Sequence, residues 1–404
     1  MGMLHADSNH ARIYPWNSAR QPEQIDRAID IGKDLTLNTT KLFEIGRVGQ
    51  LGTRKGNPAN AYSLRQYENG AMAFFRDLAN LVDPSTGEST EIDLDDLKST
   101  RFNLSHDYTD DTGTFIGSVW YPNMRVNKIT INIGDPDSAI ERNFDLIGEK
   151  YCILPGYYVA YAEQVASGAS EVISFGGTSE PPTPIEYKTA TYMLMVLRVR
   201  AGVVTELTSS SYSYNDGTQE LTVTGCLASD LIKVYYVSAS AYTDLWEDNE
   251  DDADAYYADQ ITIYAQIGSG TGAQLFKLQS IGIDIAFTRK DYKELGNKNV
   301  VQTGVSEKTV TVTLGRILED FTIEEVLSGE SNPKYIDTSE LSDDVTIIVK
   351  IYTDNTKTTF MMEYKMVGLA PSALSDSQAV EDYQSANNSL IGSSFSVSLE
   401  ETVF

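Results

Sequence analysis

The sequence has little of the chemistry that most enzymes and metalloproteins use. Its 404 residues include only two cysteines and three histidines. Cys152 and Cys226 have neither metal-ligand nor redox spacing, so we interpret them as two unrelated buried thiols. A histidine-based zinc site needs grouped ligands, whereas His5, His10 and His106 are scattered. We therefore expect no metal site, no cofactor and no cysteine- or histidine-based catalysis.

Motifs of catalysis and phosphate binding are also missing. The chain contains no nucleophile elbow, Walker loop, HExxH or CxxC motif. Carboxylate pairs could be drawn at will from 58 acidic residues, so no single pair indicates a glycosidase. We predict that the protein is not an enzyme.

Long apolar runs and basic residues are scarce as well. No apolar run reaches transmembrane length, and residues 1–15 are mixed and polar, without a signal-peptide pattern. We expect a protein made in a cytoplasm, with no membrane partner. The net charge is −27, from 31 bases and 58 acids, and such a surface repels phosphate. The acidity fits plain solubility, a saline habitat, or a surface past which nucleic acid slides without sticking.

What the sequence does contain is a repeat. Residues 31–46 and 281–296 share Ile, Gly, Asp, Glu and Gly at a constant offset of 250. Further matches are Ile13-Tyr14 with Ile263-Tyr264 at the same offset and, at an offset of 244, Tyr108-Thr109-Asp110 with Tyr352-Thr353-Asp354 and Leu146-Ile147-Gly148 with Leu390-Ile391-Gly392. The change of offset predicts one longer loop in the first copy, between residues 47 and 60. We infer a duplicated domain.

Hydrophobic patterning predicts a mainly β fold of the α+β type. Each copy reads as roughly six strands and one helix. Alternation is clearest in four runs, 129–133, 281–287, 309–314 and 345–351. Apolar residues at helical spacing predict one helix within 69–81 and its counterpart within 319–327.

The residues between the two copies resemble no other segment of the chain. Strand-like runs at 192–200, 219–224 and 231–237, with a turn signal at Asn215-Asp216-Gly217, predict a small Ig-like β-sandwich. The Gly/Ser/Pro-rich residues 168–184 read as a linker or loop, and the acidic run 246–254 as a solvated linker. The predicted domains are therefore 1–152, 153–245 and 246–404.

The second copy carries a resemblance to a known family. An alternating isoleucine strand leads into the turn Asp291-Tyr292-Lys293-Glu294-Leu295-Gly296, then a long loop, a threonine-alternating strand and one short helix. This order resembles the major tail tube protein of long-tailed, siphovirus-like viruses. The first copy departs from it, with Lys41 and Leu42 in place of Asp291 and Tyr292.

The resemblance implies a structural role in a virion. Single tube modules form hexameric rings whose sheets join into one barrel, so two tandem modules per chain imply a homotrimeric, pseudo-hexameric ring. Stacked rings would form the tail tube through which the genome is ejected. Implied partners are the tape measure, terminator and distal tail proteins, and viral DNA that passes through without specific binding. The middle domain would decorate the outside, with host glycans as one possible ligand.

Two groups of residues are candidates for contacts in such a tube. We predict that the polar strand faces line the lumen, the alternative being outer solvent; their residues are Asp34, Asp284, Thr309, Thr311 and Thr313. We predict that the loops 47–60 and 297–308 contact the next ring, the alternative being ordinary hairpin loops; their residues are Arg47, Arg54, Lys55, Asn297, Lys298 and Lys308.

Other classes of protein remain open on the sequence alone. A carbohydrate-binding adhesion protein would use some of the 24 tyrosines and three tryptophans for sugar stacking, although core packing explains them equally well. A hydrolase with an unrecognised site is a second alternative. A distal tail or baseplate hub protein would form one ring and stop, and the inner tube of a contractile tail would need a sheath.

Overall fold

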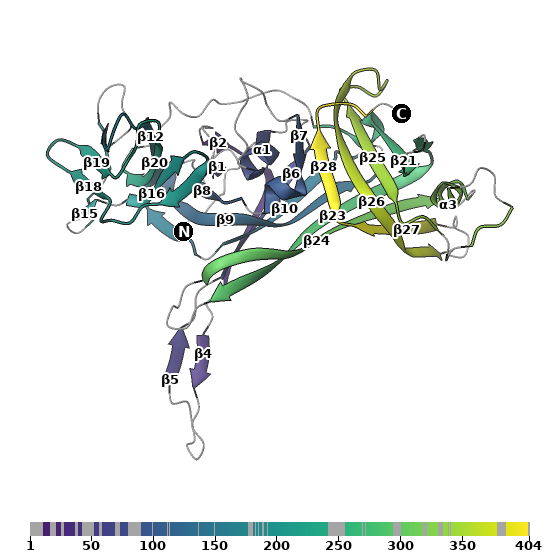
Figure 1. The fold of residues 1–404 in the computed structure, drawn as a ribbon, viewed down its shortest axis with the longest axis horizontal. Coiled ribbons are helices and arrows are strands. Elements are labelled where there is room, and N and C mark those ends of the chain that lie inside the picture. Colours follow the sequence, from purple (N-terminus) through teal and green to yellow (C-terminus); the bar gives the residue numbers. More distant parts are fainter. Residues whose placement is uncertain are drawn as a thin grey trace, which may run out of the picture.

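A computed structural model gives the fold of the chain. It describes residues 11–402 except 17–21, 26–27, 37–38, 43–51, 56–58, 69–72, 80–89, 99, 111, 113, 136, 149, 177–180, 182, 185, 188–189, 192, 241–254, 269, 271, 294–299, 318–320, 330–333, 338, 340 and 378–384. The described residues are mostly in antiparallel strands with three short α-helices, so the predicted mainly β class is confirmed (Figure 1).

The first half of the chain forms two sheets that share one long strand. Its elements are β1 (Ala11–Pro15), β2 (Glu23–Gln24), β3 (Ala28–Thr36), β4 (Thr39–Leu42), β5 (Gly52–Lys55), β6 (Ala59–Tyr67), α1 (Ala73–Ala79), β7 (Glu91–Asp93), α2 (Leu94–Lys98), β8 (Phe102–Thr109), β9 (Phe115–Ile133), β10 (Glu141–Gly148) and β11 (Cys152–Pro155). One sheet has the order β3-β6-β10-β9, and the other β2-β1-β8-β9-β11.

The second half repeats this arrangement. Its elements are β21 (Ile261–Ile267), β22 (Ala273–Leu275), β23 (Leu278–Lys293), β24 (Val300–Ile317), α3 (Thr322–Ser328), β25 (Val345–Tyr352), β26 (Phe360–Ser377), β27 (Ser385–Gly392) and β28 (Ser394–Ser398). The orders are β23-β24-β27-β26 and β22-β21-β25-β26-β28, strand for strand those of the first half.

The two halves agree even in their β-bulges. The β3–β6 ladder shifts register between Ala28 and Asp30, and the β23–β24 ladder shifts at the same place 250 residues later. Bulges also match between β9–β10 and β26–β27, where β9 and β26 are offset by 245 residues. Because a bulge is a specific local departure from the ladder, matching bulges give a residue-by-residue equivalence.

This equivalence corrects three details of the sequence comparison. It makes Ile13 equivalent to Ala265, which displaces the Ile13-Tyr14 match by two residues. The offset of 250 holds throughout the hairpins β3–β6 and β23–β24, so residues 47–60 are not a longer loop. The extra residues of the first half lie after α1, where β7 and α2 are inserted. The pairing registers also make Tyr108 equivalent to Ile351, which displaces the Tyr108 match by one residue.

Both predicted helices lie near their predicted places, whereas α2 was not predicted. Both α1 and α3 have seven residues, and Phe75 and Leu78 of α1 and Leu327 of α3 are buried in the main core. Helix α3 ends where Gly329 takes a left-handed conformation and donates its N–H to the carbonyl oxygen of Val326.

The middle of the chain forms a separate β-sandwich. Its strands are β12 (Tyr158–Val165), β13 (Ser170–Ser174), β14 (Glu186–Tyr187), β15 (Ala190–Thr191), β16 (Met193–Arg200), β17 (Val203–Glu206), β18 (Tyr212–Asn215), β19 (Glu220–Thr224) and β20 (Leu231–Ser238). A sheet β12-β20-β16-β17 faces a sheet β13-β19-β18 across a core of its own. Its first and last strands pair antiparallel, which differs from the order of an Ig constant domain. Strand β13 lies inside 168–184, so that segment is not a plain linker.

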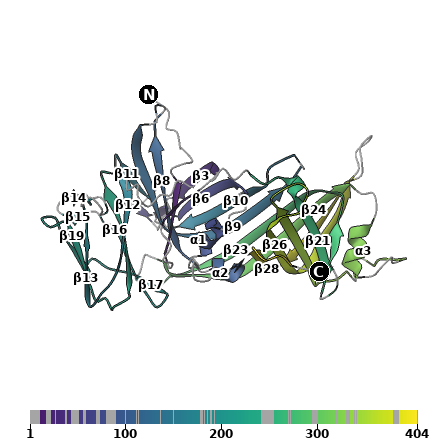
Figure 2. The same cartoon turned by 90° about the horizontal axis from the view of Figure 1, so that it is seen from above.

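The sandwich is docked on the first half through aromatic side chains. The rings of Tyr14, Trp120 and Tyr235 lie 5.2–5.6 Å apart between centroids, and all three residues are almost fully buried. Lys233 donates to the carbonyl oxygen of Pro15 at 3.1 Å. Its burial lowers the pKa of the ammonium to about 8. The sandwich therefore has a fixed packing interface with the first half, at one end of the molecule (Figure 2).

Candidate functional site

The most distinctive surface is the open face of one sheet that runs through both halves. Strand β9 of the first half pairs with β23 of the second, which joins the two four-stranded sheets into β3-β6-β10-β9-β23-β24-β27-β26. We call these eight strands the shared sheet. One of its faces covers the main core, where side chains such as Ile283 and Val312 are fully buried.

The other face of the shared sheet is lined mainly by small and polar side chains. Alternation along each strand places them there, since neighbours in sequence point to opposite faces. Those along the middle of the sheet are Asp34, Ser63, Asp145, Thr130, Asp284, Thr311, Thr313, Ser389 and Ser375. One open face thus carries all five residues predicted to line a lumen, Asp34, Asp284, Thr309, Thr311 and Thr313. That this face lines a lumen stays a prediction.

Part of the charge on the open face is paired locally. Lys128 Nζ lies 2.8 Å from Asp284 Oδ1, and the Thr130 hydroxyl donates to the same oxygen at 2.7 Å. Partial burial opposes ionisation of Asp284, but these hydrogen bonds and the Lys128 charge hold the pKa of its carboxyl below the ordinary value. Arg65 and Glu141 form a looser pair at 4.0 Å. The face therefore combines hydroxyls and two charge pairs with the exposed carboxylates of Asp34 and Asp145.

The joint between the halves is an antiparallel ladder with an apolar underside. Ile281, Ile283 and Ile285 of β23 lie opposite Ile133, Ile131 and Ile129 of β9, and all six are at most 2% exposed. Asp284 on the open side reaches across the same joint, because Lys128 and Thr130 belong to β9. The joint thus buries isoleucine below and forms a carboxylate–hydroxyl contact above.

Arg289 adds hydrogen bonds from the second half to backbone of the first. Its guanidinium donates to the carbonyl oxygens of Val126 and, at 2.9 Å, Lys98. Burial lowers the pKa of Arg289 to about 10.

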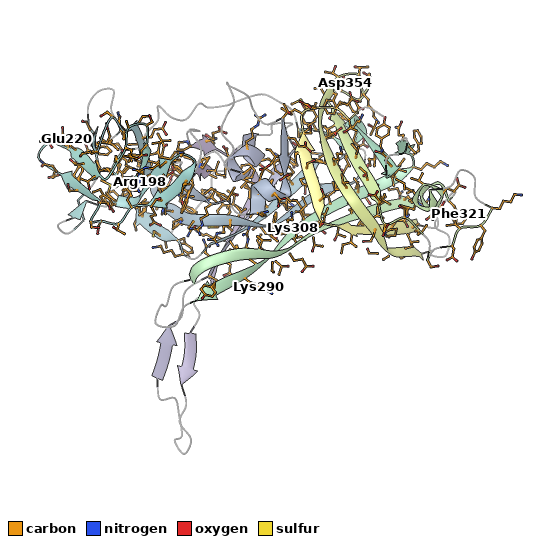
Figure 3. All side chains as sticks on the ribbon, in the orientation of Figure 1. Arg198, Glu220, Lys290, Lys308, Phe321 and Asp354 are labelled. Atoms are coloured by element: carbon orange, nitrogen blue, oxygen red, sulfur yellow. The ribbon has the colours of Figure 1, made fainter. Side chains whose placement is uncertain are left out.

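The inserted segment β7–α2 of the first half also holds the second half. Strand β7 pairs with β28, the edge of the other half's five-stranded sheet. Asp95 at the start of α2 accepts hydrogen bonds from Lys308, at 2.9 Å, and from Lys98, and these hold the pKa of its carboxyl at about 2. Lys308, predicted to contact another ring, therefore makes an ion pair within its own chain. Figure 3 labels Lys308 on the ribbon.

A buried charged cluster crosses between the halves as well. Arg142 Nη1 lies 3.2 Å from Glu68 Oε1, and the two side chains are 1% and 0% exposed. The hydroxyl of Tyr364, from β26 of the second half, donates to the other oxygen of Glu68. Burial and the nearby Glu68 charge raise the pKa of Tyr364 well above its ordinary value, so the tyrosine remains a donor. No sequence pattern pointed to these three residues.

The structure describes only some of the remaining predicted contact residues. Arg47, Asn297 and Lys298 lie outside the described residues. Arg54 and Lys55 belong to strand β5, and residues 300–308 belong to β24, so neither segment is simply a loop. The β4–β5 hairpin stands away from the body in Figure 1.

The shared sheet has two free edges in the described part of the chain, β3 and the second half of β26. They are the equivalents of β23 and β9, the strands that form the joint between the halves. At the β26 edge an apolar side chain is exposed. Leu374 of β26 is 37% exposed, whereas its equivalent Ile129 in the joint is 0% exposed.

Comparisons with known proteins add no identity. No protein-family model and no curated protein matches the chain. Within the described residues no cluster of three or more His, Cys, Asp or Glu side chains could hold a metal ion. None of the helices described is long and apolar enough to cross a bilayer. Cys226 is buried and Cys152 half-buried, and neither is in a disulfide.

Proposed function

We propose that the protein is a structural subunit that assembles edge to edge into closed rings of three chains, and that these rings stack into a tail tube that conducts a viral genome. The observation that carries the proposal is the order of the shared sheet. Its last strand, β26, is the equivalent of β9, and its first strand, β3, is the equivalent of β23. One free edge of the shared sheet is therefore the equivalent of the strand with which the first half binds the second, and the other free edge is the equivalent of the strand that is bound.

Such a pair of edges is a head-to-tail interface. An interface of this kind generates rings when the rotation closes and open filaments when it does not. Closure would also remove both exposed strand edges, which otherwise favour aggregation. The joint between halves, which already has the geometry of one such step, is the template for the joint between chains.

The number of strands fits a wide channel. Three chains with eight strands each would give a barrel of 24 strands. Strands about 4.8 Å apart and tilted by about 40° then give a diameter of about 48 Å between backbone centres. After side chains are allowed for, this leaves room for a nucleic acid duplex.

The chemistry of the open face suits passage rather than binding. Phosphate groups are held mainly by clustered lysine and arginine side chains. On the open face, Lys128 is paired with Asp284 and Arg65 with Glu141, and hydroxyl groups fill much of the space between them. A duplex would therefore meet few unpaired cations as it moved past.

Parts outside the shared sheet supply the remaining contacts in this proposal. The β4–β5 hairpin would contact the next ring. The sandwich, docked on the five-stranded sheet of the first half away from the open face, would lie on the outside of the tube (Figure 2). In the virion the tube would end on terminator and distal tail proteins and enclose a tape measure protein.

The test is the assembly state of purified full-length protein, measured by sedimentation velocity and negative-stain electron microscopy. Three-chain rings that stack into hollow filaments are the expected result. Isolated rings that never stack would replace the tube with a hub-type ring protein. A monomer at all concentrations, with affinity for glycans, would overturn the proposal in favour of an adhesion protein.

A further inference from the structure

The matching bulges allow the joint between chains to be written residue by residue. In the joint within the chain, positions 282–286 of β23 lie opposite positions 132–128 of β9. The offsets of 250 for β3 and 245 for β26 transfer this register to the free edges. The transferred pairs are Gly32 with Ser377, Lys33 with Asp376, Asp34 with Ser375, Leu35 with Leu374, and Thr36 with Ala373.

Most of these pairs repeat the chemistry of the joint within the chain. Asp34 and Ser375 are exposed on the open face, where Asp284 and Thr130 form a carboxylate–hydroxyl hydrogen bond. The same register sets Leu35 opposite Leu374, in place of Ile285 and Ile129.

Two pairs differ in kind. Thr36 with Ala373 replaces Ala286 with Lys128, so the joint between chains has no counterpart of the Lys128 cation. The second is a charged pair. Ile283 and Ile131, both fully buried, are replaced by Lys33 and Asp376, residues of opposite charge. In the free chain Lys33 is exposed, donates to the Tyr108 hydroxyl at 2.5 Å and lies over that ring at 4.3 Å from its centroid. Opposite charges directly across an antiparallel pair stabilise it, and like charges destabilise it.

We propose that neighbouring chains join by antiparallel pairing of β26 with β3 in this register, and that Lys33 of one chain opposite Asp376 of the next makes the joint selective. The inference rests on the proposed ring. Because one edge carries the cation and the other the anion, β3 is matched to β26 and not to a second β3. Both strands of the isoleucine joint belong to the same polypeptide, so that joint needs no such selectivity.

Charge reversal in the full chain tests the pair. Lys33→Asp alone and Asp376→Lys alone each place like charges opposite each other, and we expect each to weaken association about tenfold or more. The double variant restores opposite charges and should recover ring formation. Asp216→Lys, the same charge change in an exposed turn of the sandwich, is the matched control and should assemble as the wild type does.

Mixing the two single variants tests the number of chains separately. Their unlike edges are complementary, so the chains can alternate around a ring only if its number of members is even. We expect mixtures to give open pairs but no closed rings if the ring has three chains. Closed mixed rings would keep the charge pair and overturn the trimer.

A cross-link tests the register without changing Lys33 or Asp376. Asp34→Cys combined with Ser375→Cys should form disulfides between chains under mild oxidation and give a closed three-chain product, whereas either cysteine alone should not. Wild-type rings that assemble although neither reversal has an effect and the cysteines do not cross-link would overturn this joint while leaving the proposed function standing. Failure of the wild type to form rings would instead overturn the proposed function.

Discussion

Replacing Arg142 with methionine should show how strongly the buried charged cluster holds the molecule together. Arg142 is 1% exposed and pairs with Glu68, which is 0% exposed and also accepts the hydroxyl of Tyr364 from the other half. Methionine keeps much of the side-chain volume but removes the charge. The substitution therefore leaves a carboxylate in the core without its cation.

The expected cost follows from that burial. Removing one partner of a fully buried ion pair costs about 3–5 kcal/mol, because the other charge stays desolvated. Removing the pair together is much less costly, so Arg142→Met combined with Glu68→Gln should recover most of the loss. The matched control is Arg65→Met, whose pair with Glu141 is 4.0 Å apart and 44% and 33% exposed. That control should change the free energy of unfolding by less than about 1 kcal/mol.

Urea unfolding followed by tryptophan fluorescence measures these differences, at a protein concentration where wild type and variants are all monomeric. A double-mutant cycle over Glu68 and Arg142 gives the coupling free energy directly. If Arg142→Met costs no more than Arg65→Met, or if the double variant is less stable than both single variants together predict, the reasoning about the cluster is refuted.

Three further predictions concern single residues. Burial lowers the pKa of Lys233 from 10.5 to about 8, so between these pH values the unfolded chain binds more protons and the contribution of Lys233 to stability rises with pH. Lys233→Met should raise the free energy of unfolding at pH 7 by about 1–3 kcal/mol and remove that rise. The difference in unfolding free energy between variant and wild type across a pH series measures both effects. Gly392→Ala should destabilise by about 1–3 kcal/mol, because a Cβ there would lie 2.9 Å from a backbone oxygen, whereas Gly304→Ala, with open space around it, should be close to neutral in thermal unfolding. Lys308→Ala should raise the pKa of Asp95 from about 2 toward 3.8, and NMR titration of that carboxyl would contradict the ion pair if it did not move.

The sequence alone was enough for the most regularly alternating strands and for the face each of them buries. Thr309, Thr311 and Thr313 alternate with buried Val310, Val312 and Leu314, and the isoleucines of β23 are buried as their spacing predicts. This works because side chains in a strand alternate between the two faces, so a period of two in hydrophobicity records which face meets the core. The offset of 250 in the hairpin strands was visible for the same reason.

Predictions from the sequence were wrong at places where the alternation of apolar and polar residues was weak. Residues 300–308 read as a loop because Gly304 and polar neighbours interrupt alternation, yet β24 continues through them as a partner of β23. The insertion β7–α2 was placed in the wrong loop, since short matches fix an offset only at the residues that match.

Which edges meet was decided only by the tertiary structure. Backbone N–H and C=O groups are the same in every strand, so an alternating pattern states which face is buried and leaves open which strand lies alongside. The pairing of β9 with β23, the ion pair between Glu68 and Arg142 and the contact of Lys308 with Asp95 all join residues more than 70 positions apart in the chain. They depend on how the two halves pack, and that packing leaves β3 and β26 as the edges open to another chain.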